Sequence, residues 1–94
     1  MEIKGTGKLL RVFVGEGDRY HGQPLFEAIV KRLREEGLAG ATVIKGIEGF
    51  GAGSRVIHTA RILRLSEDLP VLIEVVDQEE RIARAVAFIE QMVE

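Results

Sequence analysis

Glycine occupies every second position of one short stretch, at Gly49, Gly51 and Gly53. Closely spaced glycines let backbone N–H groups approach an anionic or planar ligand, because no Cβ atom obstructs the approach. The stretch is not a dinucleotide-binding fingerprint, since no G-x-G-x-x-G is completed and no helix is expected after it. The run at residues 5–8 is not a P-loop either, because it precedes the first expected strand. We interpret residues 49–53 as a candidate binding loop, with a plain connection between two strands as the alternative.

Basic side chains follow the glycines, at Arg55, Arg61 and Arg64. A guanidinium group binds phosphate oxygens through two parallel N–H bonds, so this run favours an anionic ligand beside the glycines. A solvated basic face is the alternative. We expect residues 52–68 to be mobile in the free protein, because Gly-rich chain loses much entropy on ordering and has few apolar anchors here.

His21 and His58 are the only histidines. Arg55 and Arg61 flank His58, which suits an anion better than a metal cation. Neither histidine has a cysteine or a carboxylate at ligand spacing, so the pattern favours no metal site. Neither has a serine or aspartate in a recognisable catalytic arrangement, and acid–base catalysis needs two tuned groups in one cleft. We therefore expect no catalytic residues; a small enzyme that uses His21 or His58 is the alternative.

The composition predicts one small domain, residues 1–94, in the cytoplasm. Of its 94 residues 46% are hydrophobic, which is enough for a packed core. With 13 basic and 15 acidic side chains the chain lacks the cationic excess of a nucleic-acid binder. The absence of cysteine excludes disulfides and thiolate chemistry. No apolar run is long enough for a membrane span, and the N-terminus does not open a signal peptide.

Apolar residues on both faces of the first expected strand indicate a partner. Leu10, Val12 and Val14 alternate with Leu9, Arg11 and Phe13 before a turn at residues 15–18. Helices would cover one face, so we expect a second subunit to bury Leu9 and Phe13 on the other. The first helix should begin at Pro24 and end at Gly37, and its expected inner stripe is Phe26, Ile29, Val30 and Leu33.

The second half of the chain predicts two strands and a helix. Residues 41–47 are rich in β-branched side chains and predict a strand, and residues 69–76 predict another, with Val71, Ile73 and Val75 on one face. Asp77 and Glu80 match a capping box for the last helix. The expected inner stripe of that helix is Ile82, Ala85, Val86, Phe88, Ile89 and Val93. The order β-α-β-β-α predicts an α+β, ferredoxin-like domain whose fourth strand is short or missing.

Several of these segments resemble a known family. The segment 37–43, Gly49-Phe50-Gly51, His58-Thr59 and the strand 69–76 resemble the PII (GlnB-like) nitrogen-regulatory proteins. A fuller resemblance, over nearly the whole chain, is to the related family called domain of unknown function 190, and it is carried by residues 8–10, 20–22, 62–70 and 73–77.

The PII resemblance implies a homotrimer that holds an adenine nucleotide in clefts between subunits, next to a loop that reports the occupant to a regulated protein partner. Apart from such a nucleotide, we expect no cofactor and no metal, and we expect no catalysis. A metal-ion-binding trimer of the copper-tolerance type, which shares the fold, is a further alternative. Carried over residue by residue and joined to the basic run, the candidate ligand-binding residues are Gly40, Thr42, Gly49, Phe50, Gly51, Arg55, His58 and Arg61.

Overall fold

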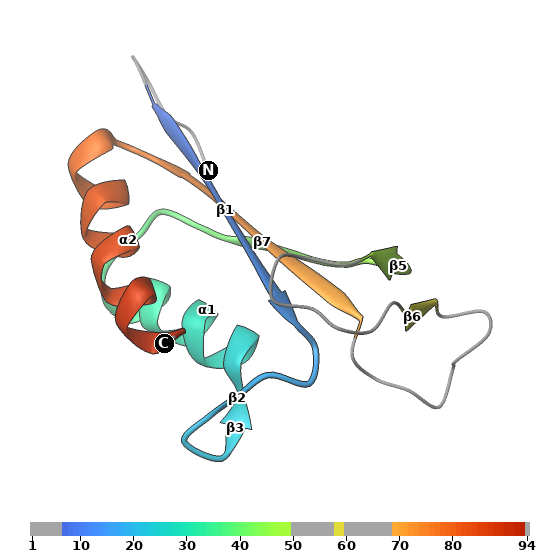
Figure 1. Ribbon diagram of the computed structural model, residues 1–94. Coiled ribbons are helices and arrows are strands. Elements are labelled where there is room, and N and C mark those ends of the chain that lie inside the picture. The colour runs from blue at the N-terminus through green and yellow to red at the C-terminus, as the bar shows by residue number, and fades with distance from the viewer. Residues whose placement is uncertain (1–6, 50–57, 60–68, 94) are drawn as a thin grey trace.

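The computed structural model describes residues 7–49, 58–59 and 69–93. Its elements, in chain order, are β1 (Lys8–Gly15), β2 (Arg19–Tyr20), β3 (Gln23–Pro24), α1 (Leu25–Glu35), β4 (Thr42–Lys45), β5 (Glu48–Gly49), β6 (His58–Thr59), β7 (Pro70–Asp77) and α2 (Glu79–Met92). Both helices lie on one side of the main sheet (Figure 1). The fold therefore has two layers, with the helices in one and the sheet in the other.

The main sheet has three strands in the order β1-β7-β4, and β7 is antiparallel to both neighbours. β1 and β4 are consequently parallel to each other, with α1 as the crossover between them. This arrangement agrees with a ferredoxin-like β-α-β-β-α domain, as the sequence predicted. Two short hairpins, β2–β3 and β5–β6, interrupt that order.

Helix α1 begins where the sequence predicted and buries a slightly different face. Pro24 is the N-cap residue, and its ring fixes a φ of −58° that leads directly into the helix. The buried side chains are Leu25, Ala28, Ile29 and Leu33. Phe26 and Val30 are only partly buried at the edge of the core. The buried face of α1 therefore includes Leu25 and Ala28, which the predicted inner stripe left out, and it has Phe26 and Val30 only at its edge.

A Schellman motif ends α1. Gly37 has a φ of +86°, in the left-handed region that glycine enters without a steric penalty. Its N–H donates to Arg34 O (3.1 Å), and the N–H of Leu38 donates to Leu33 O (3.1 Å). These two bonds satisfy carbonyl groups that a helix end leaves open. The predicted stop at Gly37 is confirmed.

Strand β7 forms the centre of the sheet. Val71, Ile73 and Val75 are buried against the helices, and Glu74 lies on the opposite face, as predicted. Their alternation follows from the two-residue period of a strand. Core side chains from α1, α2 and β7 form one cluster, and Leu10, Val12 and Val14 of β1 pack against it.

The predicted capping box of α2 is wrong. Asp77 is the last residue of β7, Gln78 is the N-cap residue, and no side chain caps the helix. Asp77 Oδ2 instead accepts a hydrogen bond from the distant N–H of Ala39 (2.9 Å). The predicted stripe is also corrected at its end, because Met92 is buried whereas Val93 is 45% exposed. The carboxylate that the local pattern predicted as a helix cap therefore forms a tertiary hydrogen bond with Ala39 instead.

Candidate functional site

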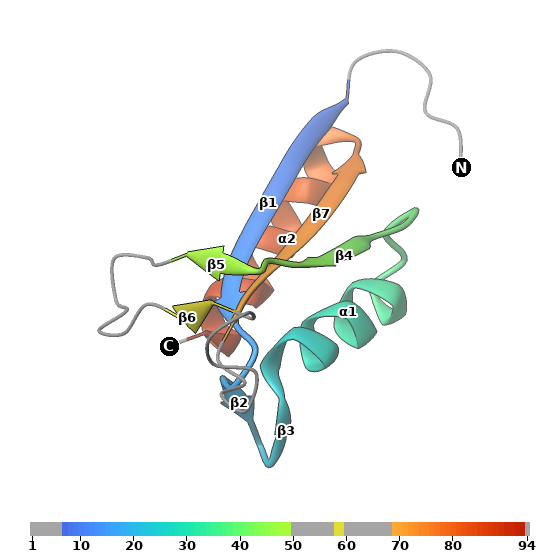
Figure 2. The same ribbon diagram turned by 90° about the vertical axis from the view of Figure 1, so that its right-hand side faces the viewer.

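The sheet face opposite the helices carries apolar side chains that no described element covers. We call it the outer face and define it by Leu9, Arg11, Phe13, Thr42, Ile44, Leu72, Glu74 and Val76. Phe13 is 70% exposed, Leu9 50%, Ile44 49% and Val76 37%. Figure 2 shows β1 and β7 from this side, with α2 behind them. A solvated antiparallel sheet face normally carries polar side chains, so this composition makes the outer face a candidate binding surface.

The strand register arranges the outer face in three rows. Leu9 lies opposite Val76, and Phe13 lies opposite Leu72, which is paired with Ile44 on its other side. Between these apolar rows, Arg11 lies opposite Glu74, which is paired with Thr42. Arg11 Nε donates to Glu74 Oε2 at 2.8 Å. One charged row therefore separates two apolar rows.

Three strand ends meet where the Gly-rich segment leaves the sheet. The N–H of Glu16 donates to Leu69 O (2.7 Å), and the N–H of Gly46 donates to Pro70 O (2.7 Å). Glu16 Oε2 also forms an ion pair with Lys45 Nζ at 2.8 Å, which joins the ends of β1 and β4 across β7. These three contacts hold the strand ends together at the point where residues 46–49 leave the sheet.

Glu16 and Lys45 are candidate site residues that the sequence did not reveal. Glu16 Oε1 is buried and has no hydrogen-bond partner among the described residues. A buried carboxylate oxygen is a strong acceptor, so it is suited to receive an N–H or hydroxyl group. The available sequence signal was an acidic residue at the end of the first strand and a basic one at the end of the second, but only the strand order shows that they pair.

The structure brings two of the predicted ligand residues together. Gly49 in β5 lies directly opposite His58 in β6. Phe50, Gly51, Arg55 and Arg61 lie outside the described residues, as does most of the segment 52–68 that was expected to be mobile.

Gly40 and Thr42 lie at the other end of the same stretch. Thr42 is the first residue of β4, and Gly40 precedes it in the connection from α1. Figure 2 shows β4 and β5 at opposite ends of a largely extended segment. A fully extended strand rises about 3.3 Å per residue, so Thr42 and Gly49 are at most roughly 23 Å apart. A compact ligand bound at one end of this segment is therefore not expected to contact the other end of the same chain.

His21 occupies a hairpin turn. Its φ of 50° is in the left-handed region, and its ring stacks on Tyr20 with 4.1 Å between centroids. In the parts of the chain that are described, no group of three or more His, Cys, Asp or Glu side chains is placed to hold a metal ion. His21 thus has a local packing contact and no carboxylate partner in the described structure.

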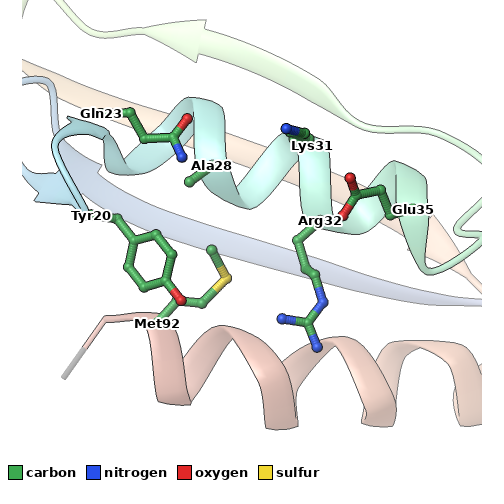
Figure 3. Close-up of a pocket in the computed structure, with 7 residues that line it drawn as sticks. All are labelled: Tyr20, Gln23, Ala28, Lys31, Arg32, Glu35 and Met92. Atoms are coloured by element: carbon green, nitrogen blue, oxygen red, sulfur yellow. The ribbon is translucent and has the colours of Figure 1, made fainter.

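An open hollow lies between α1, the β2–β3 hairpin and the end of α2 (Figure 3). Its lining residues are Tyr20, Gln23, Ala28, Lys31, Arg32, Glu35 and Met92. Arg32 reaches toward α2, where its guanidinium lies 4.6 Å from the Phe88 ring centroid, and its Nε donates to Glu36 Oε2 at 2.8 Å. The volume of about 170 Å³ is below the few hundred typical of small-molecule sites. None of the predicted ligand residues lines it, so it is not the expected site.

The surroundings of the buried Asp77 side chain favour its charged form. Burial alone would raise the pKa of Asp77, but N–H donors from Ala39 and Gln78 and the charges of Arg81 and Arg84 lower that pKa below its ordinary value. Arg81 Nη1 lies 3.8 Å from Asp77 Oδ1. The charged form is therefore the stable one, which makes this group a tie between segments and not a proton donor.

The fold and the outer face define a small two-layer, ferredoxin-like α+β domain with one sheet face left uncovered. Comparison with known sequences gives its family. The family model DUF190, described as "Uncharacterized ACR, COG1993", matches residues 7–94. The chain belongs to this family, as its sequence resemblance predicted.

Two curated relatives are similar to this chain over most of its length. "UPF0166 protein MJ1524" of Methanocaldococcus jannaschii is 47% identical over 77 residues, which are 82% of this chain and 69% of the relative. A "UPF0166 protein" of Aquifex aeolicus is 39% identical over 77 residues, 82% of this chain and 72% of the relative. Neither helix within the described residues is long and apolar enough to cross a membrane.

Proposed function

We propose that this protein is a PII-like regulatory protein that acts in the cytoplasm as a homotrimer. It binds a small anionic ligand, such as an adenine nucleotide, in a cleft between subunits, and reports the occupant to a protein partner. The uncovered outer face is the observation that carries the proposal. Its exposed apolar rows are suited to pack against another copy, and at about 25 cal/mol per Å² burial of Phe13 and its neighbours favours assembly.

The separation of the candidate ligand residues supports a cleft between subunits. Thr42 and Gly49 lie at opposite ends of one extended segment, so a compact ligand meets both only where two chains adjoin. Lys45 lies between them in sequence and contributes a cationic side chain at the base of the Gly-rich segment. The adenine nucleotide itself is proposed from the resemblance of residues 37–51 to PII proteins.

The test measures assembly and ligand binding separately. Light scattering at micromolar concentration should return the mass of a trimer. Calorimetric titration with ATP, ADP, AMP and cyclic AMP should then show binding of at least one of them. Thr42→Val, which replaces a hydroxyl by a methyl group of similar size, should weaken that binding about tenfold, as expected for one lost hydrogen bond.

Gly49→Val should abolish the same binding, because a branched side chain blocks close backbone approach. Both variants should keep the trimer mass. A monomeric wild type would overturn the assembly, and a trimer that binds none of the four nucleotides would overturn the nucleotide.

A further inference from the structure

The charged row at the centre of the outer face is placed where the proposed subunits would meet. Arg11 and Glu74 lie between two apolar rows, and both side chains keep partial exposure, 56% for Arg11 and 29% for Glu74. An ion pair on a solvated surface contributes only about 0–1 kcal/mol to folding. Its position in the middle of an apolar surface is thus not explained by the stability of the single chain.

Both partners of this pair keep unused bonding capacity. Arg11 engages Glu74 Oε2 through Nε alone. Its two terminal amino groups have no partner among the described residues, and Glu74 Oε1 likewise has none. A guanidinium group has five N–H donors and a carboxylate accepts at both oxygens, so each side chain can bind a second partner.

The pattern of the outer face is complementary to itself. When a second copy is placed with its β7 facing this chain's β1, Arg11 of one chain lies opposite Glu74 of the other. In the same placement Leu9 meets Val76 and Phe13 meets Leu72, so apolar rows cover apolar rows. A face with a single sign of charge would repel its own copy, whereas this row carries one cation and one anion on neighbouring strands.

We infer that Arg11 of one chain pairs with Glu74 of a second copy, and that this contact sets the register of self-assembly on the outer face. The inference rests on the proposed assembly and adds which residues recognise the partner copy. Assembly would bury this pair and exclude water from it. A contact between like charges there costs far more free energy than it does on a free surface. The row therefore rejects other registers as well as stabilising the correct one.

Two charge reversals test the inference, because neither variant can form the pair within its own chain. Arg11→Glu has two acidic groups in the row, and Glu74→Arg has two basic groups. Each variant alone should self-associate at least about tenfold more weakly than the wild type in sedimentation analysis, since like charges then face each other. An equimolar mixture of the two variants should recover much of the wild-type association. In that mixture, opposite charges meet in the row only where a chain of one variant faces a chain of the other.

A matched control separates this contact from general charge attraction. Lys8 and Glu79 form another exposed ion pair, at 3.3 Å, away from the outer face. Lys8→Glu and Glu79→Lys change the net charge by the same amounts, and neither these variants nor their mixture should alter association. Circular dichroism checks that every variant is folded; if a reversal fails to fold, Arg11→Gln and Glu74→Gln replace it, and each should still weaken association.

The outcomes distinguish this inference from the proposed function. A wild type that assembles while the charge variants assemble equally well overturns the inference alone. So does a mixture that associates no better than its separate components, or a control pair that behaves in the same way. A monomeric wild type overturns both the inference and the proposed homotrimer.

Discussion

Asp77 connects distant parts of the chain through one carboxylate. Its Oδ2 accepts from Ala39 and its Oδ1 from Gln78, at 2.9 and 2.7 Å. Asp77→Ala leaves two backbone N–H groups without this acceptor and should lower the free energy of unfolding by about 2–3 kcal/mol. Asp77→Asn should cost less, because its amide retains one acceptor oxygen. Chemical denaturation at neutral pH measures both; equal stability of wild type and Asp77→Ala would contradict the connection.

The same carboxylate predicts a pH dependence. The folded-state pKa of Asp77 is lowered, so its stabilising contribution is present above the unfolded-state pKa of about 4 and is lost as the pH falls through the folded-state value. The wild type should therefore lose more stability between about pH 6 and pH 2 than Asp77→Asn does. Thermal melts across this range measure the difference. Parallel curves for the two proteins would show that Asp77 is not linked to acid unfolding.

His21 should be replaceable without loss of the fold. Its side chain is exposed and stacks on Tyr20 in the hairpin turn. His21→Ala removes only the contact of one exposed ring, so the free energy of unfolding should change by less than about 1 kcal/mol. A loss above about 2 kcal/mol would instead reveal a structural role for the stacked ring.

At the scale of the secondary-structure elements, Gly46 lets the chain pass close to Pro70 of β7 as it leaves the end of β4. A Cβ atom on Gly46 would lie 2.8 Å from Pro70 Cγ and 3.3 Å from Pro70 O. Gly46→Ala should therefore destabilise the protein by about 1–3 kcal/mol, because the Pro70 ring or the strand must shift. Gly7→Ala, at an exposed position before β1, is the control and should leave the melting temperature nearly unchanged. Similar melting of both variants would mean that the contact relaxes freely.

For the molecule as a whole, Phe13 should matter for assembly and not for folding. It is 70% exposed, so Phe13→Ser should change the stability of the single chain by less than about 1 kcal/mol. In the proposed trimer the ring is buried, and its loss should weaken association at least about tenfold. Light scattering over a concentration series measures this. Val93→Ser, at an apolar position after α2 that is 45% exposed, is the matched control; equal effects of the two changes would remove the outer face from the interface.

Local signals in the sequence were enough to predict most elements and the family. Strand β7 is recognisable from its two-residue alternation, and α1 from Pro24 at its start and Gly37 after its end, because these signals act within a few residues. The same local rules failed at Asp77, where a capping pattern competed with a hydrogen bond to Ala39, 38 residues away.

How the elements combine became visible only in the folded chain. The order β1-β7-β4 places Arg11 beside Glu74, 63 residues later in the chain, and joins Glu16 to Lys45 across the strand between them. The two-residue alternation of the first strand predicted that Leu9 and Phe13 share one face. Only the pairing register of β1, β7 and β4 shows that Ile44, Leu72 and Val76 lie on the same surface. Contacts of this kind depend on which strands pair after the chain returns, and no short-range preference of the residues specifies that pairing.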